Sequence, residues 1–327
     1  MRMLLHTQYR RLGRFCLTLL FGAPFLSLAH AAYPDRPITI INPFPAGGPS
    51  DLVARTLAAH LSENLKQTVL VDNRTGAGGS IAAEYLAKSA ADGYTLLVGI
   101  DSTFTINPHI YTQGFTQVSD LDTLAVVGSS GMLIGVNADL GIKTLPNFLS
   151  EAGNREFNFA SGGNGSPGHL SMAQIAQATG ARLNHVPYKG NAPAVLAIIS
   201  GHVQGGTLAK PGMLPHVKSG KISALAVTSR QRSPLLPTVP TVGEAGFDQL
   251  GFEVLYVVMA PKGLPSSVST VLRRAFADAV KDPGVVQRFQ QLDLQPETLS
   301  GETARVRLEE QAERYGRLVN AAGVTVN

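Results

Sequence analysis

Short apolar runs alternate with stretches of helical periodicity along most of the chain. The first three runs, at residues 37–44, 68–74 and 94–100, have the length of buried strands. Helical periodicity separates them, over residues 50–64 and 80–91. Strands that alternate with helices predict a parallel sheet with helices on its faces.

The same alternation returns further along the chain. The predicted order there is helix 144–153, strand 157–161, helix 169–180, strand 183–188, helix 192–201 and strand 222–229. Two long apolar strands, 122–137 and 252–261, lie at the ends of this second series, and helices near 266–281 and 302–320 close the chain. We therefore predict an α/β fold of two lobes joined by two crossing strands. Residues 32–125 and 253–327 form the first lobe and residues 126–252 the second.

Residues 1–31 have the features of a secretory signal peptide. A basic start precedes an apolar stretch at 15–28, and Ala29-His30-Ala31 fits the small-x-small cleavage rule. The pair Arg10-Arg11 is compatible with twin-arginine export, but we favour ordinary Sec export. Both routes place the mature chain outside the cytoplasm.

Removing this segment changes the charge balance. The 27 Lys and Arg residues fall to 23, which equals the number of Asp and Glu, so a basic nucleic-acid surface is not expected. The only cysteine, Cys16, leaves with the segment, which excludes disulfides and cysteine chemistry from the mature chain. The histidines lack metal-ligand spacing and do not cluster in the sequence, and no cofactor motif is convincing.

Two glycine-rich loops follow predicted strands and precede predicted helices. They are "PFPAGGPSD" at 43–51, where Ser50 or Asp51 is predicted to cap the helix, and "ASGGNGSPGHL" at 160–170. Unpaired N–H groups in the first turn of a helix, approached through glycines, bind anions without any arginine. The alternative is that each loop is a simple turn with a helix cap. A third stretch, "TGAGGS" at 75–80, is predicted as a turn.

The second loop also permits other interpretations. Its glycines at 163, 165 and 168 fit a dinucleotide-binding pattern, but no acidic residue ends the next strand, which argues against that function. Ser166 is not part of a nucleophile elbow, because Asn164 occupies the required glycine position. His169 either points at a ligand or holds the loop through its ring nitrogens.

Six stretches of the chain form a specific combination. They are "YPDRPITIINPFPAGGPSDLVAR", "VDNRTGAGGSIAAEYLAKSAADGYTLLVG", "NPHIY", "SGGNGSPGHL", "VPYKGNAPAV" and "PHVKSGKISALAVTSRQRSPLLPTVPTVGEAG". In this combination the chain resembles the substrate-binding receptors of the tripartite tricarboxylate transporter family, the Bug or TctC-like proteins. The resemblance covers essentially the whole chain after the signal segment.

The resemblance implies a two-lobed periplasmic binding protein of the type II-like, Venus-flytrap kind. Such a receptor is a monomer without a cofactor that binds a small organic carboxylate between its lobes and delivers it to one large and one small membrane subunit. By match to the family's loops, the ligand-binding residues are Phe44, Ala46, Gly47, Gly48, Ser50 and Asp51 in the first loop, Ser161, Gly162, Gly165, Ser166 and His169 in the second, and Ser102 and Thr103 after the third strand.

The chain departs from the family pattern at three places. Gln204 and Leu208 stand where acids are usual, which argues against an amino-acid ligand, and Leu255 stands where a Trp is usual. Lys210 either binds a distal carboxylate of the ligand or is simply solvated. Two alternative functions stay open: an exported enzyme that uses Ser166 with His169, and a sensor that docks a signalling kinase.

Overall fold

Three parallel strands at the start of the chain form one end of the sheet. The computed structural model describes residues 33–111 and 115–323, so the predicted signal peptide lies outside the described residues. Strands β1 (Ile38–Asn42), β2 (Val69–Asn73) and β3 (Thr95–Ile100) pair in the order β2-β1-β3. Helix α1 (Pro49–Leu65) connects β1 to β2, and α2 (Ser80–Ala87) follows β2. The predicted parallel sheet is confirmed.

A second parallel group forms the other end of the sheet. Strands β5 (Phe157–Ser161), β6 (Leu183–Pro187) and β7 (Gly205–Ala209) pair in the order β7-β5-β6. The helices of this part are α5 (Leu145–Asn154), α6 (Pro167–Thr179), α7 (Asn191–Ile199) and α8 (Lys210–Lys218). The sequence analysis did not predict β7 or α8, because glycine and proline interrupt the apolar pattern there.

Two long strands join these groups into one sheet of ten strands. Strand β4 (Leu121–Asn137) pairs with β9 (Glu253–Pro261) as far as Gly131, and from Met132 onward it pairs with β7. The predicted crossing strands are therefore confirmed. The lobe limits at 125/126 and 252/253 stay a prediction, and β4 runs through the first of them without a break.

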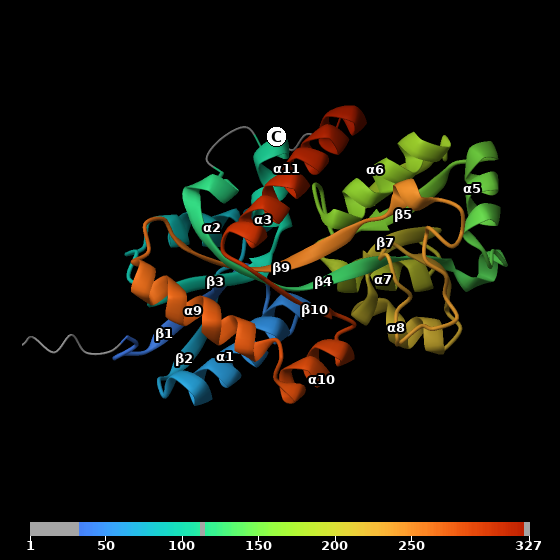
Figure 1. The fold of residues 1–327 in the computed structure, drawn as a ribbon. Helices are drawn as coiled ribbons and strands as arrows, with labels where there is room; N and C mark the ends of the chain where they lie inside the picture. The colour runs from blue at the N-terminus through green and yellow to red at the C-terminus, as the bar shows by residue number, and fades with distance from the viewer. Residues whose placement is uncertain (1–32, 112–114, 324–327) are drawn as a thin grey trace, which may run out of the picture. The chain divides into compact units, whose positions relative to one another are not determined.

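The end of the chain packs against both crossing strands (Figure 1). Helix α9 (Ser266–Ala279) and α11 (Glu302–Ala322) correspond to the two predicted helices. Between them lie α10 (Pro283–Gln291) and β10 (Gln295–Ser300), which the sequence analysis did not predict. Strand β10 pairs with β4 beside its midpoint, as β8 (Ile222–Val227) does further along.

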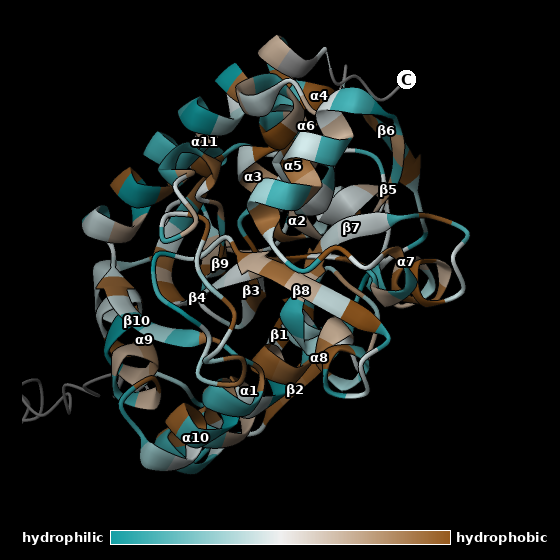
Figure 2. Ribbon diagram, turned by 90° about the vertical axis from the view of Figure 1, so that its right-hand side faces the viewer, coloured by the Kyte–Doolittle hydropathy of each residue, from teal (hydrophilic) through white to brown (hydrophobic). Residues whose placement is uncertain are grey.

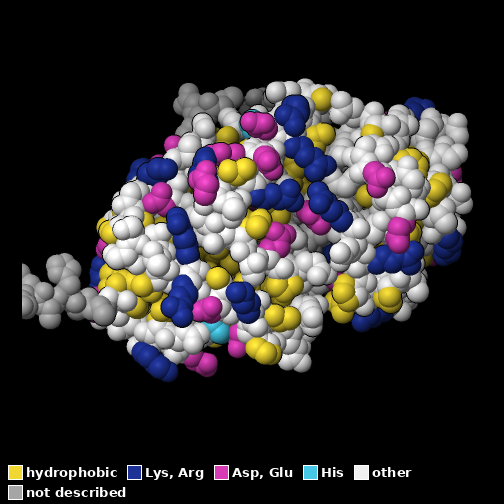
Figure 3. Space-filling view, in the orientation of Figure 1, with side chains coloured by type: hydrophobic (Ala, Val, Ile, Leu, Met, Phe, Trp, Pro, Cys, Tyr) yellow, Lys and Arg dark blue, Asp and Glu magenta, His cyan; other side chains and the backbone are white. Residues whose placement is uncertain are grey.

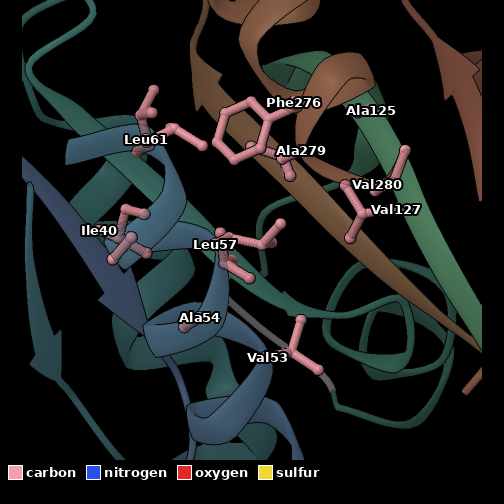
Figure 4. Packing of buried hydrophobic residues seen from close by; sticks show 14 of the residues in the cluster. Ile40, Val53, Ala54, Leu57, Leu61, Ala125, Val127, Phe276, Ala279 and Val280 are labelled. Carbon is pink, nitrogen blue, oxygen red and sulfur yellow. The ribbon is translucent and has the colours of Figure 1, made fainter. Parts of the chain in front are cut away.

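Apolar side chains of α1 and α9 bury one face of the first strand group. Val53, Leu57 and Leu61 on α1 lie across from Phe276 and Val280 (Figure 4). Hydrophobic residues follow the strands, whereas the outer helices carry hydrophilic stretches (Figure 2). None of the helices within the described part of the chain combines the length and apolarity needed to cross a bilayer.

Candidate ligand-binding site

The first glycine-rich loop is held from inside the sheet by Asn42, the last residue of β1. Its side chain donates to Ser50 Oγ at 2.9 Å and to the carbonyl of Val98 at 3.0 Å. Its Oδ1 accepts from the N–H of Phe44 at 2.9 Å. Because Asn42 is fully buried, these bonds fix the point at which the chain leaves the strand.

Asp51 closes the same loop from the first turn of α1. Its Oδ2 accepts from the N–H of Gly47 at 2.8 Å, and its Oδ1 accepts from Asn73 Nδ2 at 2.9 Å. Asn73 also donates to the carbonyl of Phe44. Burial disfavours the ionised carboxylate of Asp51, but the hydrogen bonds from Arg55, Gly47 and Asn73 outweigh burial and lower its pKa.

The predicted cap of α1 by Ser50 or Asp51 is wrong. The N-cap is Gly48, which has no side chain to offer, and both predicted residues turn their side chains back to Asn42, Gly47 and Asn73. Among the described residues, no hydrogen bond is found to the N–H groups of Ser50 and Asp51. The first turn of α1 therefore keeps free donors, as an anion site requires.

The stretch at 75–80 joins the first loop instead of being only a turn. A Cβ atom on Gly79 would lie 2.5 Å from Thr103 Oγ1 and 3.0 Å from the Cβ of Pro43. Asn107 donates to the carbonyl of Gly78 at 3.0 Å. The loops that follow β1, β2 and β3 thus meet at one edge of the sheet. Their shared position after parallel strands is the signal that the sequence analysis missed for this stretch.

Ser102 and Thr103 begin the short helix α3 (Ser102–Thr105) and are buried. Asp101 anchors this turn, because its carboxylate accepts from the N–H of Leu255 at 3.0 Å and from Gln311 Nε2 at 2.7 Å. Complete burial raises the pKa of Asp101 to about 7, despite these hydrogen bonds. The third loop is therefore tied to β9 and α11.

The second glycine-rich loop is organised by its own hydroxyls and by a histidine from β6. Ser161 Oγ accepts from the N–H of Gly163 at 3.1 Å and lies 2.7 Å from Nε2 of His185. Ser166 is the N-cap of α6 and accepts from the N–H of His169. Gly162, between these residues, lies beside the loop at Gly190.

His169 holds this loop through its ring. Its Nδ1 accepts from the N–H of Gly165 at 3.1 Å, so the neutral ring carries its proton on Nε2. Its ring stacks on His185 with centroids 3.6 Å apart. Burial lowers the pKa of His169, and burial together with His169 lowers the pKa of His185 to about 4. The fold therefore brings together two histidines that are far apart in the sequence.

The second loop lies against the helices that follow Thr103. A Cβ atom on Gly165 would lie only 1.9 Å from Ile110 Cδ1, at the end of α4 (Asn107–Ile110). Ile110 belongs to an apolar cluster with Leu170 of α6 and Tyr315 of α11. Elements of the two strand groups thus meet beside the loops.

Three positions singled out in the sequence analysis are buried. Leu208 is fully buried in an apolar cluster with residues of α7 and α8. Lys210 is only 3% exposed and its Nζ lies 2.9 Å from Asp293 Oδ2, so the interpretation as a solvated lysine is wrong. Leu255 is fully buried in a core cluster that includes Phe104. Within residues 33–111 and 115–323, no three His, Cys, Asp or Glu side chains are grouped to hold a metal.

Comparisons with known proteins identify the family of the chain. A family model described as "Tripartite tricarboxylate transporter family receptor" matches residues 53–324. BugT of Bordetella pertussis is 34% identical over 319 residues, which cover 95% of this chain and 96% of that protein.

Two solved structures extend the comparison. Rpa4515 of R. palustris with adipate superposes with a TM-score of 0.82 at 31% identity, over 90% of this chain and 99% of that one. MatC (Rpa3494) of Rhodopseudomonas palustris with bound malate gives 0.77 at 27% identity, over 88% of this chain and 100% of that one. These likenesses confirm the predicted two-lobed α/β architecture of a periplasmic binding protein. Because the family match spans most of the chain and BugT aligns along nearly its whole length, the chain belongs to the receptor family of the tripartite tricarboxylate transporters.

Proposed function

We propose that the chain is an extracytoplasmic receptor that binds a small organic carboxylate at the glycine-rich loops. The observation that carries this proposal is the free first turn of α1, where the N–H groups of Ser50 and Asp51 have no partner among the described residues. Relatives of the same family hold adipate and malate, which are both dicarboxylates.

Backbone donors would supply most of the binding free energy. A helix terminus contributes about 0.3–1 kcal/mol to a nearby anion. Each hydrogen bond to a charged group adds about 1.5–3 kcal/mol. Roughly four such hydrogen bonds would reach micromolar affinity, about 8 kcal/mol, without an arginine.

The residues proposed for contact with the ligand divide by role. Backbone groups and hydroxyls come from Phe44, Ala46, Gly47, Gly48, Ser50, Ser102, Thr103, Ser161, Gly162, Gly165 and Ser166. Asp51 is proposed to hold the first loop, since its carboxylate already accepts from Gly47 and Asn73. His169 has an N–H at Nε2 to donate to a carboxylate, because its Nδ1 is engaged by Gly165.

We further propose that the protein is exported as a monomer with its first 31 residues removed. It would close around its ligand and deliver it to one large and one small membrane subunit. A sensor that docks a kinase remains the second candidate.

The geometry argues against an exported enzyme that uses Ser166 and His169. The Ser166 hydroxyl accepts from the backbone N–H of His169, and the ring contacts Gly165 and His185 instead. No hydrogen bond joins a carboxylate to either ring among the described residues, so nothing orients His169 as a base.

Thermal melting against malate, adipate and a panel of other acids and amino acids tests the proposal. A ligand at a hundred times its dissociation constant stabilises the folded protein by about 2.7 kcal/mol, which raises the melting temperature by several degrees. A carboxylate should produce this shift and amino acids should not.

A matched pair of glycine variants locates the ligand. Gly48→Ala adds a methyl group beside the free turn, at 3.2 Å from the carbonyl of Pro45. Gly284→Ala adds one at 3.1 Å from Asp282, at the start of α10, far along the chain from the loops. The shift should be lost in Gly48→Ala and kept in Gly284→Ala. Shifts that are equal in both variants would contradict a site at the first loop.

A further inference from the structure

A buried ion pair connects the second strand group to the C-terminal part of the chain. Lys210 begins α8, directly after β7, and Asp293 follows α10. Lys210 Nζ lies 2.9 Å from Asp293 Oδ2, and their side chains are only 4% and 1% exposed. In Figure 1, α8 lies with the second strand group, and α10 lies near it at the lower edge of the molecule.

Two serines fasten Asp293 at the point where the sheet changes its pairing. Ser233 Oγ donates to Asp293 Oδ2 at 2.7 Å, and Ser130 Oγ donates to the carbonyl of Asp293 at 3.1 Å. Ser130 lies next to Gly131, where β4 stops pairing with β9, and β7 takes over at Met132. The ion pair therefore lies where the half of the molecule around β1, β2 and β3 joins the half around β5, β6 and β7.

The lysine of the pair lies beside a cavity. Lys210 lines a cavity of about 370 Å³ together with Ser130, Glu253 of β9 and Arg307 of α11. On the face viewed in Figure 1, Lys and Arg side chains lie close to Asp and Glu side chains near the middle of the molecule (Figure 3).

The energetics of a buried ion pair make this contact sensitive to any movement that separates its two charges. Removing one partner of a buried ion pair leaves an uncompensated charge, which is strongly destabilising, whereas replacing both by apolar residues is often neutral. Asp293 Oδ1 is buried and has no hydrogen-bond partner among the described residues, so this carboxylate is under-satisfied in the present arrangement. A rotation of α8 away from α10 must break the contact.

We propose that Lys210 and Asp293 are positioning residues for ligand capture. Their ion pair holds the two halves in the arrangement in which the loop at Gly165 lies against Ile110. Neither residue touches the ligand, but loss of the ion pair would leave the binding-competent arrangement less populated. Apparent ligand affinity falls in proportion to that population. The expected effect on ligand affinity rests on the proposed receptor function. The expected effect of the pair on the arrangement of the two halves does not depend on that function.

The test replaces both partners. Lys210→Met and Asp293→Leu should each lower the melting temperature, and the double variant should recover much of the loss because no buried charge remains. Arg155→Met with Glu151→Leu removes an exposed pair of 2.6 Å on the second half and serves as the matched control.

Distances between the halves in the ligand-free protein provide the deciding measurement. Spin labels on cysteines introduced at Leu70 and Leu196, which are 53% and 58% exposed, report this distance in the mature protein, which has no other cysteine once the segment with Cys16 is removed. The double variant at 210 and 293 should shift or broaden the distance distribution, and the control should leave it unchanged. Identical distributions in all three proteins would overturn the proposal.

Calorimetry with the carboxylate identified by melting adds the second measurement. Affinity should fall about tenfold in the double variant with recovered stability and stay unchanged in the control. A purely structural pair would leave affinity intact once stability is restored. If no acid binds the unmodified protein, the receptor function fails, while the spin-label distances still decide the role of the pair.

Discussion

Gly168, the second residue of α6, should not tolerate even a methyl group. A Cβ atom there would lie 2.3 Å from the carbonyl oxygen of Thr207 on β7, whereas ordinary contacts begin near 3.4 Å. The obstacle is backbone, so no rotamer change relieves it, and α6 must move away from β7 by about 1 Å. Overpacking of this kind typically costs about 1–3 kcal/mol. Gly168→Ala should therefore reduce the free energy of unfolding by this amount.

Gly153 supplies the matched control. It lies within α5, and a Cβ atom there would meet nothing within 4 Å. Since alanine is favoured over glycine inside a helix by about 0.5–1 kcal/mol, Gly153→Ala should stabilise the protein or leave it unchanged. Replacing glycine by alanine should thus lower the free energy of unfolding in α6 but not in α5.

Urea unfolding followed by circular dichroism measures the difference. The midpoint should fall in Gly168→Ala and not in Gly153→Ala, with equal slopes, which would mark a change of stability alone. Because Ser166 and His169 flank Gly168, carboxylate affinity should also weaken only in Gly168→Ala. Equal midpoints in the two variants would refute the close approach of α6 to β7.

Three further perturbations test the loops and their anchors. Asn73→Ala removes two hydrogen bonds to the first loop and should destabilise the protein by about 1–3 kcal/mol, whereas the exposed Asn154→Ala should change it by less than about 0.5 kcal/mol in urea unfolding. The pKa of His185 is about 4 in the folded protein and 6.5 in its unperturbed form, so the unfolded chain takes up the proton first and stability should fall as pH drops from 6.5 towards 4. His185→Gln should reduce that slope, and an unchanged slope would contradict a buried neutral ring. Asp101 has the opposite effect on the pH dependence of stability, because its pKa is raised from 3.8 to about 7 in the folded protein. The folded protein keeps this proton to a higher pH than the unfolded chain does, so stability should fall as pH rises from 3.8 to about 7. Asp101→Asn should remove this dependence in unfolding titrations.

The sequence alone determined most of the elements and their order, but not β7, α8, α10 or β10. The apolar run at 157–161 became β5 with the same limits, and the long runs near 122–137 and 252–261 became the crossing strands. These predictions succeeded because periodicity and glycine-rich breaks are local properties of the chain. The two glycine-rich loops were visible for the same reason, as glycines between a strand and a helix.

Only the tertiary structure decided which partner each polar side chain takes. Ser50 has the sequence of a helix cap but contacts Asn42, and Lys210 has the sequence of a surface lysine but is buried against Asp293. His169 and His185 stack because β6 lies beside β5 in the sheet, and the loop at 75–80 joins the site because β2 lies beside β1. The physical reason is common to all of them: a buried polar group must find a partner, and the strand register and helix packing bring that partner from a distant part of the chain.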